Sequence, residues 1–135
     1  MGTYAPTVAV DFDGVVHKYS KGWLDGRAYD EPVPGAFEGI RDLQRSKHAV
    51  FIFTTRDAEQ VVEWFYEHSD FEVVTDSDVE DGHGGLVKFW NDTQRLLVTN
   101  RKLPAVAYLD DRAVCFTNWL DFDAQLAALK ERHKR

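Results

Sequence analysis

Short apolar runs alternate with amphipathic stretches along this chain. Runs without polar alternation indicate strands that are buried on both faces of a sheet. The predicted strands are Val8–Val10, Ala49–Phe53, Phe71–Val74, Ala105–Leu109 and a short fifth strand at Ala113–Phe116. Strands that alternate with helices favour a parallel sheet. We therefore expect an α/β fold, a three-layer Rossmann-like parallel sheet flanked by helices.

Four stretches have the residue spacing of amphipathic helices. They open at Pro34–Gly35, follow Asp57, span Leu86–Leu97, and begin at Asp121 or Asp123. In the last of these helices, we expect Leu126 and Leu129 to face the core. The polar segment at about residues 17–34 is rich in Gly and Pro and predicts a flap. The segment at about residues 76–101 predicts a short insert within a single domain of residues 1–135.

Polar side chains follow the predicted strands rather than precede them. Asp11 and Asp13 follow the first strand, Thr54 the second, and Asp110 and Asp111 the fourth. Parallel strands bring their carboxyl ends to one edge of the sheet, where α/β proteins bind ligands. Four carboxylates gathered there repel one another unless a cation neutralises them. Mg²⁺ takes oxygen ligands of this kind, so the pattern predicts a magnesium site.

The Asp-x-Asp pair also suggests a reaction. One carboxylate, Asp11, can attack phosphorus as a nucleophile. The second carboxylate, Asp13, can protonate the leaving oxygen and then activate water. Gly14 permits the sharp turn that leaves the strand. Lys102 precedes the fourth predicted strand and adds a positive charge.

Four motifs in order resemble those of the haloacid dehalogenase-like superfamily, whose members are mostly Mg²⁺-dependent phosphatases. They are Asp11–Val16 (Asp-x-Asp and small apolar residues), Phe51–Thr54 (a strand ending in Thr), Lys102, and Tyr108–Asp111 (a strand ending in an acidic pair). The resemblance spans about residues 7–116 and is greatest to small phage and bacterial proteins. In those proteins, the lysine is followed directly by proline, whereas here Leu103 intervenes, and Lys88 is the alternative lysine.

The resemblance implies a role for each motif residue. Asp11 is the expected nucleophile and a metal ligand, and Asp13 the general acid/base, with its backbone carbonyl on the metal. Thr54 and Lys102 are expected to bind the transferring phosphoryl group. Asp110 is expected to complete the metal site directly, and Asp111 directly or through water. The expected substrate-binding residues are Thr54, Thr55, Arg56 and Lys102.

Superfamily members often carry a cap domain over the site. The flap and the insert of this chain are too short for one, so we expect an essentially capless phosphatase with an open site. Its expected substrate is a phosphomonoester, with a phosphorylated nucleotide or nucleic-acid end among the candidates.

The amino-acid composition limits the kinds of partner that the chain is expected to bind. Lys and Arg number 16 against 23 for Asp and Glu, which gives a net charge of −7. An acidic chain is a poor general binder of nucleic acid or of anionic membranes. The single cysteine, Cys115, excludes an internal disulfide. No leader sequence or membrane-length apolar run is visible, so we expect a cytoplasmic protein.

Other interpretations stay open at this stage. A receiver-like or non-catalytic phosphate-binding regulator is the alternative function, although receivers order their acidic, Thr and Lys residues differently. Thr54 satisfies backbone groups in a purely structural interpretation. Arg56 is expected to pair with a carboxylate such as Asp57 or Asp111, with substrate contact as the alternative. His17, close after Asp13, is expected at the surface, with contact to the phosphate as the alternative.

Overall fold

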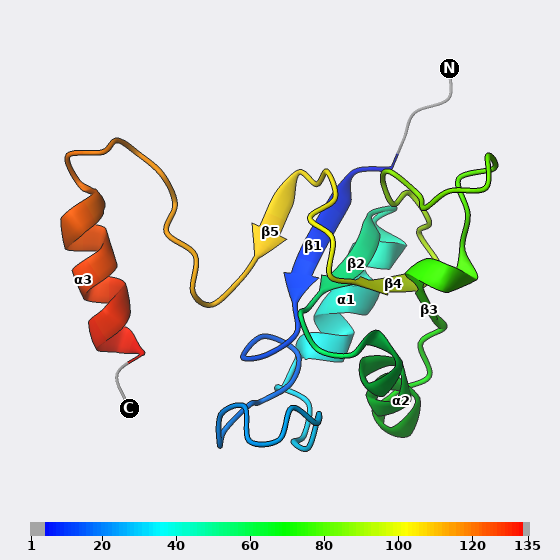
Figure 1. Cartoon of the computed structure of the whole chain (residues 1–135), viewed down its shortest axis with the longest axis horizontal. Coiled ribbons are helices and arrows are strands. Elements are labelled where there is room, and N and C mark those ends of the chain that lie inside the picture. Colours follow the sequence, from blue (N-terminus) through cyan, green and yellow to red (C-terminus); the bar gives the residue numbers. More distant parts are fainter. Residues whose placement is uncertain (1–4, 134–135) are drawn as a thin grey trace.

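The computed structural model describes residues 5–133, which contain a five-stranded, all-parallel sheet with the order β3-β4-β2-β1-β5. The strands are β1 Thr7–Asp11, β2 Ala49–Phe53, β3 Val73–Thr75, β4 Leu96–Thr99 and β5 Ala107–Leu109. The helices are α1 Ala36–Arg45, α2 Ala58–His68 and α3 Phe122–Arg132, with a 3₁₀ turn at Asp76–Asp78. The expected α/β class is confirmed (Figure 1).

Alternate residues of the central strands enter two apolar clusters, one on each face of the sheet. The first cluster packs under α1 and α2 and takes its strand residues from Val8, Val10, Val50, Ile52, Leu96 and Val98. The second takes Ala9, Phe51 and Leu97 and is covered by Trp90 and Leu103 from irregular segments of the chain. Burial on both faces explains why these strands are apolar throughout.

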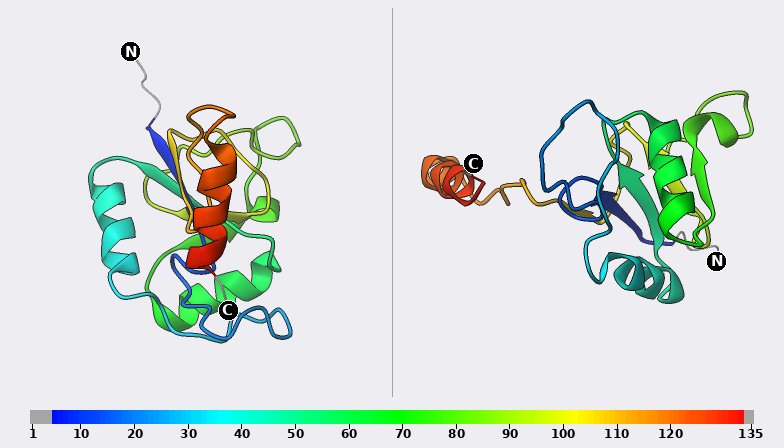
Figure 2. Two further views of the ribbon diagram at one scale, coloured as in Figure 1. Left: turned by 90° about the vertical axis from the view of Figure 1, so that its left-hand side faces the viewer. Right: turned by 90° about the horizontal axis from the view of Figure 1, so that it is seen from below.

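Helix α3 stands away from the sheet, beyond the edge strand β5 (Figures 1 and 2). Leu126 and Leu129 are half-exposed and none of its residues is buried, so the prediction that they face the core is wrong. Within this region, Phe116, Trp119 and Phe122 pack ring against ring. The C-cap residue His133 reaches the loop after β5, where its Nε2 lies 2.7 Å from the carbonyl oxygen of Asp111.

Two predicted elements are wrong. Leu86–Leu97 is not a helix, because Asp92 accepts the N–H groups of Gln94 and Arg95 and closes a local turn instead. The end of that segment forms β4, a strand inside the sheet, so the insert at about 76–101 contributes to the core. Ala113–Phe116 forms no strand and is largely exposed beyond the sheet edge.

The flap at residues 17–34 is irregular, as predicted, and lies over the carboxyl end of β1 and α2. Asp30 accepts the N–H of Ser20 at 2.9 Å and the N–H of Glu31 at 2.8 Å. Trp64 of α2 donates its indole N–H to the Asp30 carbonyl over 2.8 Å. The flap is therefore attached to the domain at Asp30.

Among the described residues, no helix is long and apolar enough to cross a bilayer.

Candidate active site

Three carboxylates meet at the carboxyl edge of the sheet. Asp11 ends β1, and Asp110 and Asp111 follow β5, which pairs with β1 in the register Val10 to Leu109. One carboxylate oxygen from each of the three acids lies within 4.8 Å of the others. The strand pairing alone brings Asp11 beside Asp110, because each leaves its strand at the same level.

The chemistry of this cluster fits a hard cation. Oδ1 of Asp111 is buried and has no hydrogen-bond partner among the described residues. A buried carboxylate oxygen without a donor is costly, and a divalent ion offers the missing positive charge. The predicted ligands Asp11, Asp110 and Asp111 are thus brought together. The fourth predicted ligand, Asp13, is expected to offer its backbone carbonyl, and its side chain bonds to Arg56 and His17 instead of joining the cluster.

Electrostatic crowding is visible in the titration of Asp11. Burial, followed by the charges of Asp110 and Asp111, raises the pKa of its carboxyl to about 7. The N–H of Phe12 opposes the shift only in part. The unneutralised cluster therefore resists full ionisation, as expected of a site that a cation completes.

The carboxylate of Asp13 does not join the cluster, because Arg56 and His17 hydrogen-bond to it. Nε of Arg56 donates to both of its oxygens, at 2.9 and 3.0 Å. Nδ1 of His17 lies 2.9 Å from Oδ1. Arg56 pairs with a carboxylate, as expected, but the partner is Asp13 rather than Asp57 or Asp111, because the turn after β2 points this side chain toward β1 and the flap.

Arg56 also fastens the flap. Its side chain is fully buried, its Nη1 donates to the carbonyl oxygen of Gly26, and its guanidinium lies 4.4 Å from the ring centroid of Trp23. Nη2 is buried without a partner among the described residues. As placed, Arg56 orders Asp13 and the flap, and substrate contact stays a prediction.

His17 is the residue that sequence reasoning missed. It is fully buried rather than at the surface, and its ring stacks on Phe12 with 5.0 Å between centroids. Its spacing of four residues from Asp13 is the one sequence signal that could have linked the two side chains.

Thr54 follows β2 next to β1, as predicted. Its buried hydroxyl oxygen accepts the N–H of Arg56 at 3.1 Å, and its own N–H donates to Thr99 at 3.0 Å. Thr54 therefore satisfies backbone groups and still has a hydroxyl hydrogen to donate. Thr55, the neighbouring predicted substrate residue, is exposed.

Lys102 follows β4 and is exposed. Its Nζ lies 5.4 Å from the ring centroid of Tyr108, and no carboxylate of residues 5–133 lies within ion-pair distance of it. The alternative lysine, Lys88, is exposed, and its charge helps to lower the pKa of Asp81. Lys102 thus lies over the ring of Tyr108, and its contact with a phosphoryl group stays a prediction.

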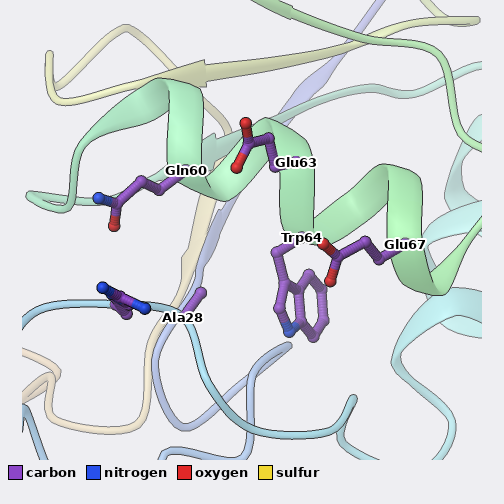
Figure 3. A pocket seen from close by; sticks show the side chains of 6 residues that line it. Ala28, Gln60, Glu63, Trp64 and Glu67 are labelled. Carbon is purple, nitrogen blue, oxygen red and sulfur yellow. The ribbon is translucent and has the colours of Figure 1, made fainter.

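Two polar cavities flank these residues. One of about 430 Å³ lies along the carboxyl ends of β2, β3 and β4, and its lining includes Thr55, Arg56, Asp57, Asp76, Thr99 and Asn100. Another of about 410 Å³ lies between the flap and α2 (Figure 3), and its lining comprises Arg27, Ala28, Gln60, Glu63, Trp64 and Glu67. Cavities of these volumes are in the range of small-molecule sites.

Comparison with known proteins adds little to this geometry. No family model and no curated protein matches the chain. A solved structure, described as that of a conserved protein coded by a locus of Bacteroides thetaiotaomicron, shares 26% sequence identity. The alignment covers 96% of this chain and 93% of that chain, with a TM-score of 0.48. That likeness assigns no activity to this chain.

Proposed function

We propose that this protein is a Mg²⁺-dependent phosphomonoester hydrolase that acts through an aspartyl-phosphate on Asp11. The observation that carries the proposal is the cluster of Asp11, Asp110 and Asp111 at one edge of the sheet. Mg²⁺ bound by these carboxylates would neutralise charge on the substrate phosphate. The alternative, a receiver-like or non-catalytic phosphate binder, needs no general acid/base beside the nucleophile. Here Asp13 can serve as one, and Arg56 and His17 hold its carboxylate in place.

The reaction has two balanced steps. A carboxylate oxygen of Asp11 forms a bond to phosphorus while the bond from phosphorus to the leaving oxygen breaks. Asp13 gives its proton to that leaving oxygen. In the second step, water attacks phosphorus and gives a proton to Asp13, and the bond between phosphorus and Asp11 breaks to release inorganic phosphate. Thr54 and Lys102 are the proposed donors to the phosphoryl oxygens.

The leaving group has space beside the phosphoryl site. The cavity along β2, β3 and β4 is lined by hydroxyl, amide and carboxylate groups and by Arg56, which favours a polar leaving group. The ring of Trp23 is exposed beside Arg56 and offers a stacking surface for a nucleotide base. A comparison of sugar phosphates, nucleoside monophosphates and phosphorylated oligonucleotide ends separates these substrates.

The proposal is tested by turnover of p-nitrophenyl phosphate with and without Mg²⁺. We expect Mg²⁺-dependent activity that falls by about 10² or more in Asp11→Asn and in Asp13→Asn. The control is Asp70→Asn, which changes an exposed carboxylate paired with Arg41. Acid-quenched protein should carry one phosphoryl group on Asp11. Full activity in Asp11→Asn contradicts the proposal.

A further inference from the structure

His17 connects the flap to Asp13. Nε2 of its ring accepts the backbone N–H of Asp30 at 2.9 Å, so the ring hydrogen sits on Nδ1. That Nδ1–H donates to Oδ1 of Asp13 over 2.9 Å. Asp30 is also the residue at which Trp64 of α2 holds the flap. One buried side chain thus joins the attached end of the flap to the proposed acid/base.

Packing alone does not explain a histidine at this position. The ring is fully buried, lies parallel to Phe12, and meets Tyr29 and Trp64 edge-on at 5.2 and 5.8 Å. A phenyl ring would fill the same space without burying two polar nitrogens, which is costly unless both are bonded. Both are bonded here, so the two hydrogen bonds are what the imidazole adds to the site.

The two oxygens of Asp13 are not equivalent. Oδ1 accepts from His17 and from Nε of Arg56, each at 2.9 Å. Oδ2 has only the second branch of the Arg56 bond, at 3.0 Å. A carboxyl proton resides on the oxygen that accepts fewer hydrogen bonds, because two donors leave no lone pair free on the other. The transferable proton of Asp13 therefore belongs on Oδ2.

We propose that His17 is a positioning residue that orients the acid/base Asp13 through one ring nitrogen and holds the flap through the other. The inference rests on the proposed function. His17 fixes Oδ1 of Asp13 so that Oδ2 presents its proton to the leaving oxygen as the bond from that oxygen to phosphorus breaks. His17 keeps its own proton throughout, since its other nitrogen is occupied by the Asp30 N–H.

Three variants separate the two bonds of His17. His17→Asn places an amide N–H near the position of Nδ1 and gives up the acceptor for Asp30. His17→Gln places a carbonyl oxygen near the position of Nε2 and gives up the donor to Asp13. His17→Phe keeps the ring alone. The control is His83→Gln, in an exposed loop.

Activity is measured on two probes of similar shape, p-nitrophenyl phosphate and phenyl phosphate. Phenolate is the poorer leaving group and needs the proton more. We expect the ratio of kcat/KM for phenyl to that for p-nitrophenyl phosphate to fall about tenfold in His17→Gln and His17→Phe. In His17→Asn, the ratio should stay near the wild-type value. An unchanged ratio in His17→Phe overturns the positioning role.

Flap closure is measured without turnover, by trypsin cleavage after Lys21 and Arg27 within the flap. Cleavage should accelerate in His17→Asn and His17→Phe and keep its wild-type rate in His17→Gln. Wild-type cleavage in His17→Phe overturns the role of His17 in holding the flap. Wild-type protein that hydrolyses neither probe overturns the proposed function, and in that case the cleavage result still decides whether His17 holds the flap.

Discussion

Gly14 packs directly against the carboxylate of Asp111. A Cβ at Gly14 would lie 2.3 Å from Oδ2 of Asp111, well inside any real contact, and Gly14 has a φ of +84°. The turn after β1 and the loop after β5 meet here only because one of the two residues has no side chain. The geometry of the acidic cluster thus depends on a glycine that carries no chemistry itself.

Gly14→Ala is expected to displace Asp111 and weaken Mg²⁺ binding by about tenfold or more. The control is Gly22→Ala, because Gly22 also has a positive φ, +74°, but has nothing within 4 Å of its Cβ position. The readout is the rise in melting temperature that Mg²⁺ produces, which follows its affinity for the folded protein. An equal rise in both variants would show that Asp111 takes no part in binding.

The metal-free protein should lose stability as the pH rises. Burial and the neighbouring acids raise the pKa of Asp11 from 3.8 to about 7, so the fold favours its protonated form. The stabilisation is complete below the unfolded pKa and is lost as the pH rises through about 7. Melting temperatures in EDTA should therefore fall between about pH 5 and pH 8, and by less in Asp11→Asn. A fall of the same size in Asp11→Asn would contradict this origin.

Removing the guanidinium of Arg56 is expected to destabilise the fold. Arg56→Met leaves Asp13 without its main partner, at a cost of about 2–4 kcal/mol, below the full value for a buried pair because Asp13 is partly exposed. The comparison is Arg45→Met, which breaks an exposed pair with Asp42 and should cost less than about 1 kcal/mol. Urea unfolding measures both. Equal costs would mean that the Arg56 pair behaves as a surface pair.

The position of α3 predicts that the same Leu-to-Ala substitution lowers stability by different amounts in β4 and in α3. Leu97→Ala, in the fully buried part of β4, should cost about 2–5 kcal/mol. Leu126→Ala, on the half-exposed helix beyond β5, should cost less than about 1 kcal/mol. Thermal unfolding of both variants gives the comparison. A large loss in Leu126→Ala would mean that α3 packs on the domain in solution.

The strands that line the site were predictable because each is a short apolar run between turn residues. Ala49–Phe53 was predicted to the residue, and Asp11 and Asp110 were placed together by the parallel pairing of their strands. β4 was missed because Leu96 and Leu97 continue an apparent helical pattern that begins at Leu86. In the structure, the side chain of Asp92 closes a turn just before these two residues, and no helix forms.

The partners of Asp13 were beyond the reach of the sequence for a different reason. Arg56 lies 43 residues from Asp13 along the chain, and its direction is set by the path of the flap. The burial of His17 depends on the rings of Phe12, Tyr29 and Trp64 and on the N–H of Asp30. A pattern of hydrophobic and polar residues records neither the path of an irregular loop nor the direction of a side chain.

Calorimetric titration of Mg²⁺ into wild-type protein, Asp110→Asn and the exposed-carboxylate control Asp70→Asn tests most directly whether the acidic cluster is a metal site. The account predicts one site in the wild type and in Asp70→Asn, with an affinity that falls at least about tenfold in Asp110→Asn. The same Mg²⁺ affinity in all three proteins, or no binding to the wild type, would contradict it.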